Sequence, residues 1–398
     1  MVLRLSIMMF LQFCVFGATL PIFSLFWKDH LHLTGSEIGF IFSVASVSSL
    51  ISPLISSFIA DKYIRSKYIL AFSNFFMGII LIFLRFQTSF PNILFFYLLY
   101  AILNGPVIGL TNAIAFHTLS DKRDKFGNIR VWGTAGYMFI GAFFSLVYLS
   151  IPGNEGKIGD SLIAAGICAI ILSIFALTLP NYKMEKPASI KEVFPIDAIK
   201  ILFRKEILLI LIIQYLVFIA DRFYFLSTAP FLSSIGIAEK IIMPIMSLGQ
   251  FTEIFAMMLL GLLLPKIGYK KLLILGLFAE ILRFGGYLAG SFHPLAIFGV
   301  VIHGFTYAFI YVTISIYLDE NSTTKTRTAL HQLFFMLIFG VGGFIGNTFA
   351  GKVIDFSSVN NIVNYNILWI FPIAIIAFVL LLTIFLMPEK KEEKVYVS

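Results

Sequence analysis

Apolar runs as long as a bilayer is thick recur along this sequence. The segments Ile69 to Leu84 and Ile367 to Met387 contain no charged residue. A helix needs about 20 mostly apolar residues to cross a bilayer. Only 13% of the 398 residues are charged, whereas a soluble domain carries about a quarter. The runs also lack the alternating pattern of outer-membrane barrel strands. The sequence therefore predicts an all-α membrane protein and excludes a single soluble core.

Charges, prolines and glycines divide the apolar runs into twelve predicted transmembrane helices. These lie near residues 5–27, 37–60, 68–87, 92–116, 130–151, 160–180, 206–228, 240–264, 272–291, 294–318, 328–351 and 365–387. Prolines inside or beside the runs, namely Pro53, Pro106 and Pro230, are expected to mark kinks or helix ends.

The longest hydrophilic stretch falls between the sixth and seventh predicted helices and divides the membrane part in two. We therefore expect a six-helix bundle over 1–180, a cytoplasmic linker over 181–205 and a second six-helix bundle over 206–388. A cytoplasmic tail over 389–398 completes the chain.

Lysine and arginine concentrate in every second loop, and positive charge near helix ends is retained on the cytoplasmic side. With both termini inside, the lysines that remain outside are Lys28, Lys157, Lys240 and Lys352. The net charge of +8 then reflects orientation in the bilayer rather than nucleic-acid binding. The pattern predicts a multi-pass protein of the cytoplasmic (inner) membrane with both termini in the cytoplasm.

A basic loop follows the second predicted helix of each half. The loop Ala60 to Lys67 reads Ala-Asp-Lys-Tyr-Ile-Arg-Ser-Lys, and the stretch Ser36 to Lys67 is weakly echoed by Lys240 to Lys271. Internal repeats of this kind occur in transporters. Together with the long middle loop, these features resemble the major facilitator superfamily. The resemblance implies two six-helix pseudo-repeat bundles that rock about a substrate site near the bilayer midplane.

Segments spread along most of the chain resemble a narrower family, the bacterial nucleoside:proton symporters. The segments are Phe10–Cys14, Gly109–Asn112, Ile129–Tyr137, Leu179–Pro180, Gln250–Glu253 and Ile281–Phe284. The Ile-Arg-Val-Trp-Gly-Thr run within the third segment is the most specific. The resemblance implies a proton-coupled nucleoside permease that works by alternating access, and we expect it to act as a monomer.

Other functions stay open at this point. The same fold could carry a sugar, an aromatic acid or a drug, and a polytopic membrane enzyme or a lipid scramblase is a second class. An enzyme should show a catalytic cluster at one membrane face, and none is evident. The HExxH, P-loop lysine, Gly-x-Ser-x-Gly and Cys-x-x-Cys motifs are absent from the sequence. We therefore expect no enzymatic activity, cofactor or metal site.

Two groups of polar residues in apolar helices are candidate substrate contacts. The spacing of Arg130, Thr134 and Tyr137 places them on one helix face, and Gln250 and Glu253 share a face of the eighth predicted helix. A carboxylate at such depth costs at least about 2.5 kcal/mol on insertion scales, which favours a functional role. By position alone, Arg130 could equally be an anchor at the interface. The family resemblance implies that these residues line the substrate cavity.

Four further charges lie inside predicted helices of the second half. Asp221 and Arg222 are adjacent and do not face each other, so each needs another partner. We expect Arg222 to reach the substrate cavity. Glu280 and Arg283 are three residues apart and can neutralise each other locally, so we interpret this pair as structural.

The tenth predicted helix carries His303 and Tyr307 on one face, and we place both among the substrate contacts, although a lone histidine there is more often a packing residue. The resemblance implies an embedded aspartate for proton coupling where this chain has Ala308. Coupling must then use another carboxyl group, either Glu253 or Asp221. We favour Glu253, alternating between a proton and the guanidinium of Arg222.

Overall fold

The structure is a computed structural model. It describes residues 1–62, 65–119, 126–180, 196–323 and 326–389. The predicted basic loop at 60–67 lies partly outside the described residues, as do most of the predicted linker and nearly all of the tail.

Helices account for most of the described chain. In the first half they are α1 (Val2–Thr19), α2 (Phe23–Leu25), η1 (Phe26–His30), α3 (Gly35–Lys62), α4 (Ser66–Arg85), α5 (Phe90–Asn104), α6 (Val107–Leu119), α7 (Phe126–Leu146), η3 (Tyr148–Ser150), η4 (Ile158–Asp160) and α8 (Ser161–Ala176). In the second half they are α10 (Ile196–Leu202), α11 (Lys205–Ser234), α12 (Glu239–Leu288), α13 (His293–Val301), α14 (His303–Thr306), η5 (Tyr307–Val312), α15 (Thr313–Glu320), α16 (Arg327–Phe335), η6 (Met336–Gly342), α17 (Gly343–Phe356) and α18 (Tyr365–Leu386). One short antiparallel hairpin joins β1 (Ser358–Val359) to β2 (Ile362–Val363).

Ten helical stretches among the described residues are long and apolar enough to cross a membrane. This confirms the predicted all-α membrane class but differs from the predicted number of helices. The predicted helices 240–264 and 272–291 fall within the single 50-residue element α12. A straight helix of that length would measure about 75 Å, more than twice the thickness of a hydrocarbon core. α12 is interrupted at Gly268, whose φ of 75° and ψ of 173° are not helical.

Prolines lie inside or between several of the long helices. Pro106 lies between α5 and α6, whereas Pro230 lies inside α11, and Pro244 and Pro265 lie inside α12. A proline inside a helix removes one backbone hydrogen bond. Membrane helices tolerate this loss because neighbouring groups satisfy the freed carbonyl. Pro106 therefore lies at a helix end, as expected, whereas α11 continues through Pro230.

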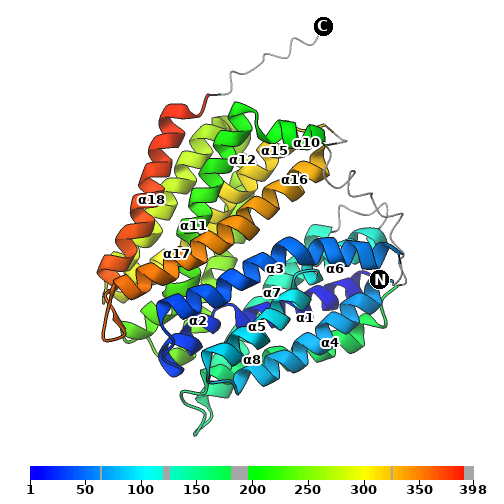
Figure 1. Cartoon of the computed structure of the whole chain (residues 1–398), viewed down its shortest axis with the longest axis vertical. Helices are drawn as coiled ribbons and strands as arrows, with labels where there is room; N and C mark the ends of the chain where they lie inside the picture. The colour runs from blue at the N-terminus through cyan, green and yellow to red at the C-terminus, as the bar shows by residue number, and fades with distance from the viewer. Residues whose placement is uncertain (63–64, 120–125, 181–195, 324–325, 390–398) are drawn as a thin grey trace.

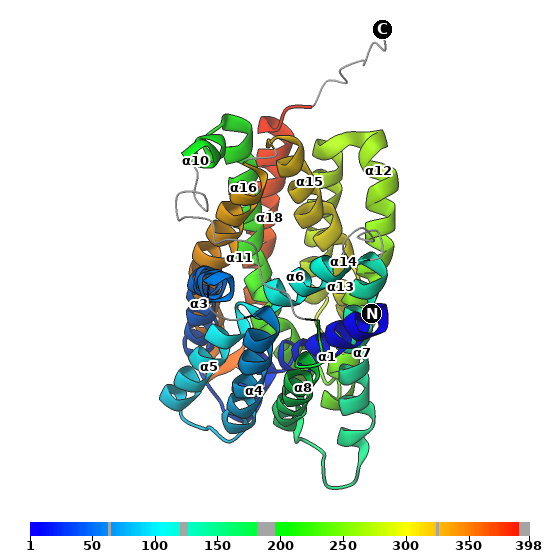
Figure 2. The same ribbon diagram turned by 90° about the vertical axis from the view of Figure 1, so that its right-hand side faces the viewer.

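Helices from the two halves of the chain gather in different parts of the molecule (Figures 1 and 2). α1 packs against α7 and α8, and α4 packs against α8. In the other part, α18 packs against both α11 and α12, and α17 packs against α11. The contacts of α3 with α17 and of α7 with α12 join the two groups.

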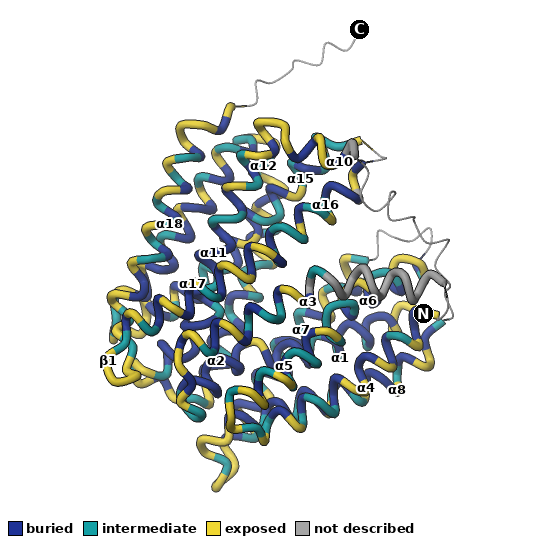
Figure 3. The backbone as a smooth tube through the Cα atoms, in the orientation of Figure 1, coloured by how far each residue is buried: buried dark blue, intermediate teal, exposed yellow. Residues whose placement is uncertain are grey.

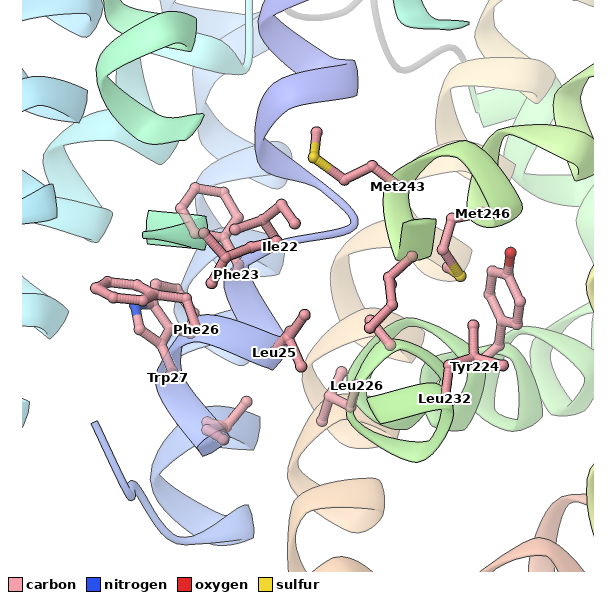
Figure 4. Packing of buried hydrophobic residues seen from close by; sticks show 14 of the residues in the cluster. Ile22, Phe23, Leu25, Phe26, Trp27, Tyr224, Leu226, Leu232, Met243 and Met246 are labelled. Atoms are coloured by element: carbon pink, nitrogen blue, oxygen red, sulfur yellow. The ribbon is translucent and has the colours of Figure 1, made fainter. Parts of the chain in front are cut away.

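A buried apolar cluster also joins the two groups of helices. Figure 4 shows Phe23 and Trp27, from α2 and η1, on one side and Leu226 of α11 and Met243 of α12 on the other. The rings of Phe23 and Trp27 stack with their centroids 4.9 Å apart. Burial of such large side chains stabilises this contact between the halves.

The contact between α3 and α17 depends on close backbone approach. A Cβ atom on Gly351 would lie 2.4 Å from the carbonyl oxygen of Gly35, so no larger residue fits there without a shift. Beside it, the carboxylate of Asp355 accepts hydrogen bonds from the backbone N–H groups of Gly35 at 2.6 Å and Ser36 at 2.8 Å. Negative charge is favourable at the start of a helix. Asp355 thus ties α17 to the beginning of α3.

Many residues on the outer faces of the helices are exposed (Figure 3), and large apolar residues are among them. Phe72 and Phe76 of α4, Phe139 of α7 and Phe385 of α18 are among them. Soluble proteins rarely expose large contiguous apolar patches, and the exposed rings of Phe72 and Phe76 lie side by side, with centroids 4.6 Å apart. These faces have the character expected of surfaces that contact lipid.

Candidate functional site

Four side chains from α7, α12 and η5 form what we call the α7–α12 cluster: Arg130, Gln250, Glu253 and Tyr307. The charges of Arg130 and Glu253 act on each other, and both act on the Tyr307 hydroxyl. The Arg130 guanidinium also lies over the ring of Phe13 on α1, 4.1 Å from its centroid. The two charged groups are only half-buried, and 39% of Tyr307 is exposed. The cluster is therefore open to a ligand.

Gln250 carries a hydrogen-bond acceptor that is unpaired among the described residues. Within the part of the chain that the structure describes, its Oε1 atom is buried and has no hydrogen-bond partner. Buried polar atoms are nearly always hydrogen-bonded, so each exception needs an explanation. A bound solute that donates a hydrogen bond to Oε1 would provide one.

The face of α7 predicted from sequence continues beyond Arg130. Thr134, one turn later, is half-buried, and Tyr137, two turns later, is buried. The Tyr137 hydroxyl lies near Tyr224 of α11. This face of α7 therefore runs from Arg130 towards α11.

A second set of side chains forms what we call the buried ion cluster: Asp221 of α11, Glu280 and Arg283 of α12, His303 of α14 and Tyr311 of η5. Nη2 of Arg283 donates to Oδ1 of Asp221 at 2.6 Å and to Oε1 of Glu280 at 2.5 Å. The Tyr311 hydroxyl donates to Oδ2 of Asp221. The charged side chains are almost completely buried, with exposures of 6% for Asp221, 1% for Glu280 and 0% for Arg283.

His303 connects this cluster to the rest of the site. Its Nδ1 lies 2.6 Å from Nη1 of Arg283. Because a guanidinium has only donors, Nδ1 must accept this hydrogen bond and therefore carries no proton. The imidazole also stacks on Tyr224, with the ring centroids 4.6 Å apart and the planes inclined by 14°. These contacts fit the interpretation of His303 as a packed, hydrogen-bonded residue.

The partner expected for Glu253 was Arg222, but the structure places Arg130 beside Glu253 instead. The Arg222 guanidinium lies over the rings of Phe218, at 3.9 Å, and Phe225, at 4.6 Å. Its Nε also donates to the Phe218 carbonyl oxygen at 3.4 Å. Stacking within α11 thus replaces the expected approach of Arg222 to Glu253.

Two glycines bring the clusters close together at the contact of α12 with α13 and α14. A Cβ atom on Gly304 would lie 2.2 Å from the backbone nitrogen of Glu253, and one on Gly249 would lie 3.1 Å from the Val300 carbonyl oxygen. Thr252 reinforces this contact, since its hydroxyl donates to the carbonyl of Val301 at 2.5 Å. The backbone of Glu253 therefore touches the residue that follows His303.

We expect Gly304→Ala to lower stability by about 1–3 kcal/mol, as overpacking does. The new methyl would meet backbone atoms of α12, which cannot rotate away, so the two helices must separate. Gly285→Ala is the matched control, because a Cβ atom there meets nothing within 4 Å. Thermal unfolding of both purified variants in detergent measures the difference. Equal melting temperatures would show that the close contact is not required.

Some of these residues were not anticipated from the sequence. Phe13, Tyr224 and Tyr311 all contact charged members of the two clusters. Tyr311 lies one helical turn after Tyr307, and this spacing could have predicted that the two side chains share a helix face. The pairing of Glu280 with Arg283 was expected, but the third member, Asp221, was not.

Comparison with known proteins gives a consistent result. A family model described as "Nucleoside H+ symporter" matches residues 1–392. The putative nucleoside transporter YegT of Escherichia coli K12 is 29% identical, over 98% of this chain and 94% of that protein. The nucleoside permease NupG and the xanthosine permease of the same strain are each 25% identical, over 92% of this chain and 91% of each relative.

Solved structures show the same fold. The crystal structure of the nucleoside transporter NupG matches with a TM-score of 0.86 at 21% identity, covering 98% of this chain and 99% of that one. A bacterial homologue of the human lysosomal transporter Spinster, in an inward-facing unoccupied conformation, matches with a TM-score of 0.71 at 14% identity, covering 96% and 95%.

Proposed function

The chain belongs to the nucleoside H+ symporter family, and from this membership we propose that it carries a nucleoside together with a proton across a membrane. The observation that supports this most strongly is the match of almost the whole chain to that family. Relatives known as nucleoside permease and xanthosine permease point to a purine or pyrimidine nucleoside as cargo. The protein is a transporter and not an enzyme.

Our proposal includes twelve crossings in two bundles, 1–180 and 206–388, joined by the linker 181–205. The break at Gly268 would divide α12 into two crossings, and α3, with 28 residues, is long enough for another. The two bundles would rock about a central site and expose it to one side at a time. The distribution of lysine and arginine supports cytoplasmic termini, and we propose that a monomer carries out the cycle in the cytoplasmic membrane.

The α7–α12 cluster would hold the nucleoside. Arg130 offers a fork of donors to carbonyl or hydroxyl oxygens, and Glu253 accepts from hydroxyls or ring N–H groups. The Gln250 amide can both donate and accept hydrogen bonds, and a donor group of the nucleoside would bond to its buried Oε1. The half-exposed ring of Tyr307 would stack on the planar base, a contact worth about 1–3 kcal/mol in nucleic-acid sites.

The other proposed substrate contacts lie at or beyond the edge of this cluster. Thr134 and Tyr137 extend the α7 face, and we keep both as contacts to the nucleoside. His303 and Arg222 have protein partners in the structure, the Arg283 guanidinium and the Phe218 ring respectively. Either residue would have to give up these contacts to reach the nucleoside directly.

Uptake into liposomes tests the proposal. Purified protein is reconstituted, an acid-outside pH gradient is imposed, and entry of labelled uridine, adenosine and xanthosine is measured against maltose, sucrose and benzoate. We expect concentration of at least one nucleoside, and its loss when a protonophore collapses the gradient. Liposomes without protein are the control. Preferential uptake of a sugar or an acid would overturn the proposed cargo, and nucleoside uptake without pH dependence would overturn the coupling.

A further inference from the structure

We propose that the transported proton binds in the buried ion cluster, on Glu280, with Asp221 and Arg283 as the charged groups that position it. This inference rests on the proposed function as a proton symporter. The spacing of Glu280 and Arg283 predicts a structural pair, and the sequence favours Glu253 for coupling. The structure supplies three reasons to choose Glu280.

The first reason is the charge balance of the cluster. Nη2 of Arg283 donates hydrogen bonds to both carboxyl groups, at 2.6 Å to Oδ1 of Asp221 and at 2.5 Å to Oε1 of Glu280. Among the described residues, Arg283 is the cation within ion-pair distance of these two carboxyls. With both carboxyls ionised, the directly bonded group carries one surplus negative charge that is almost completely buried, and the neighbouring Arg222 offsets it only through space, without a hydrogen bond to either carboxyl in the described part of the chain. Such a charge is costly in a buried site, and one bound proton removes it.

The second reason concerns which carboxyl holds that proton. Both oxygens of Asp221 accept hydrogen bonds, one from Arg283 and one from Tyr311. On Glu280, Oε1 accepts from Arg283, whereas Oε2 is buried without a hydrogen-bond partner in the described part of the chain, since the nearby Thr306 hydroxyl donates to the His303 carbonyl oxygen at 2.8 Å. An ionised carboxylate with one bare oxygen is far less favourable there than a neutral carboxyl. Asp221 is therefore held as the anion and Glu280 as the acid.

The other titratable and charged groups around the carboxyls do not replace the proton. α11 contributes Arg222 and Tyr224, α12 contributes Tyr287, α14 contributes His303 and η5 contributes Tyr311. Arg222 acts on Asp221 only as a neighbouring charge, because its guanidinium stacks on Phe218 and Phe225. His303 accepts from Arg283 and so contributes no positive charge in this arrangement.

The third reason is the connection to the α7–α12 cluster. Arg283 bonds to His303, and the next residue, Gly304, packs against the backbone of Glu253. Nε of Arg283 is buried without a hydrogen-bond partner among the described residues, so the guanidinium has a donor left to offer. When Glu280 loses its proton, a second carboxylate competes for this guanidinium. A shift of Arg283 would move His303 and with it α14. Because Gly304 of α14 packs against the backbone of Glu253, that segment of α12 would move as well.

Transport by Glu280→Gln, which mimics the protonated acid, tests the proposal. A symporter that moves one proton per nucleoside concentrates its cargo about tenfold across a gradient of about one pH unit. We expect the parent to do so and Glu280→Gln to reach only equal concentrations on the two sides. Exchange of nucleoside at equal concentrations should continue, and nucleoside binding should be retained.

Two further variants sharpen the interpretation. Glu239→Gln changes a carboxyl at the beginning of α12 that bonds to His30, and it should concentrate nucleoside as the parent does. Glu253→Gln should weaken nucleoside binding while the remaining uptake still follows the pH gradient. If Glu280→Gln concentrates nucleoside in proportion to the gradient, the inference is wrong and the proposed function stands. If the parent itself shows no coupling to pH, the proposed function has failed instead.

A measurement that avoids the Glu280 substitution covers the case in which that variant does not fold. Infrared difference spectra of Glu253→Gln, recorded between acid and alkaline buffer, should contain the carbonyl band of a carboxylic acid in a dry environment. This band should disappear as the buffer becomes alkaline and should shift when nucleoside binds. Absence of a protonated-carboxyl band at every pH where the protein transports would overturn the inference.

Discussion

Arg283→Met is expected to lower the stability of the protein by about 3–5 kcal/mol, the cost of removing one partner from a buried ion pair. Two carboxyl groups depend on this guanidinium, and both are almost completely buried. Methionine fills similar space but supplies no donor, so Asp221 and Glu280 would be left without their cation. Thermal unfolding in detergent and the yield of monodisperse protein measure the loss.

Arg85→Met is the control for this prediction. Arg85 pairs with Asp160 at 2.6 Å, but both side chains are partly exposed, at 25% and 17%. Solvent-exposed pairs contribute about 0–1 kcal/mol, and because water reaches both members of the Arg85–Asp160 pair, its loss should cost clearly less than the loss of Arg283. Combining Arg283→Met with Asp221→Asn and Glu280→Gln should restore much of the stability, because no buried charge is left unpaired. An Arg283→Met protein as stable as the parent would show that the three residues do not form a buried ionic cluster.

The membrane fold could be predicted from the sequence because a bilayer leaves few options. A chain in lipid must satisfy its backbone hydrogen bonds internally, so long apolar runs become helices. The ends of these helices could be predicted less accurately from the sequence. The seventh predicted helix was placed at 206–228, yet α11 continues to Ser234 past Pro230. Propensity would end a helix near proline, but packing around α11 maintains it.

The candidate site shows a similar division between local and long-range information. The spacing of Gln250 and Glu253, and of Glu280 and Arg283, fixes which residues share a helix face. No local pattern shows which helices are neighbours. Asp221 reaches Arg283, 62 residues away in the chain, and Glu253 lies beside Arg130 rather than Arg222. Which helices become neighbours depends on tertiary packing, and the apolar faces that pack together have similar sequences.

Arg130→Ala should weaken binding of the transported nucleoside about ten- to a hundredfold. Hydrogen bonds to a charged group are worth about 1.5–3 kcal/mol, and each 1.4 kcal/mol corresponds to about tenfold in affinity. The change also removes the charge that faces Glu253. Binding is measured by calorimetry with whichever nucleoside the liposome assay shows to be taken up fastest.

The series around Arg130 separates a substrate contact from general damage. Arg130→Lys retains the charge but not the planar fork of donors, so it should bind more weakly than the parent and more tightly than Arg130→Ala. Arg327→Ala is the control, because its guanidinium is half-exposed and pairs with Asp319 at 3.5 Å, away from both clusters. Melting temperatures close to that of the parent would show that the lost affinity is not unfolding, since Arg130 is only half-buried. If Arg130→Ala binds nucleoside as tightly as the parent, the α7–α12 cluster does not hold the cargo, and the nucleoside site must be sought elsewhere between the two groups of helices.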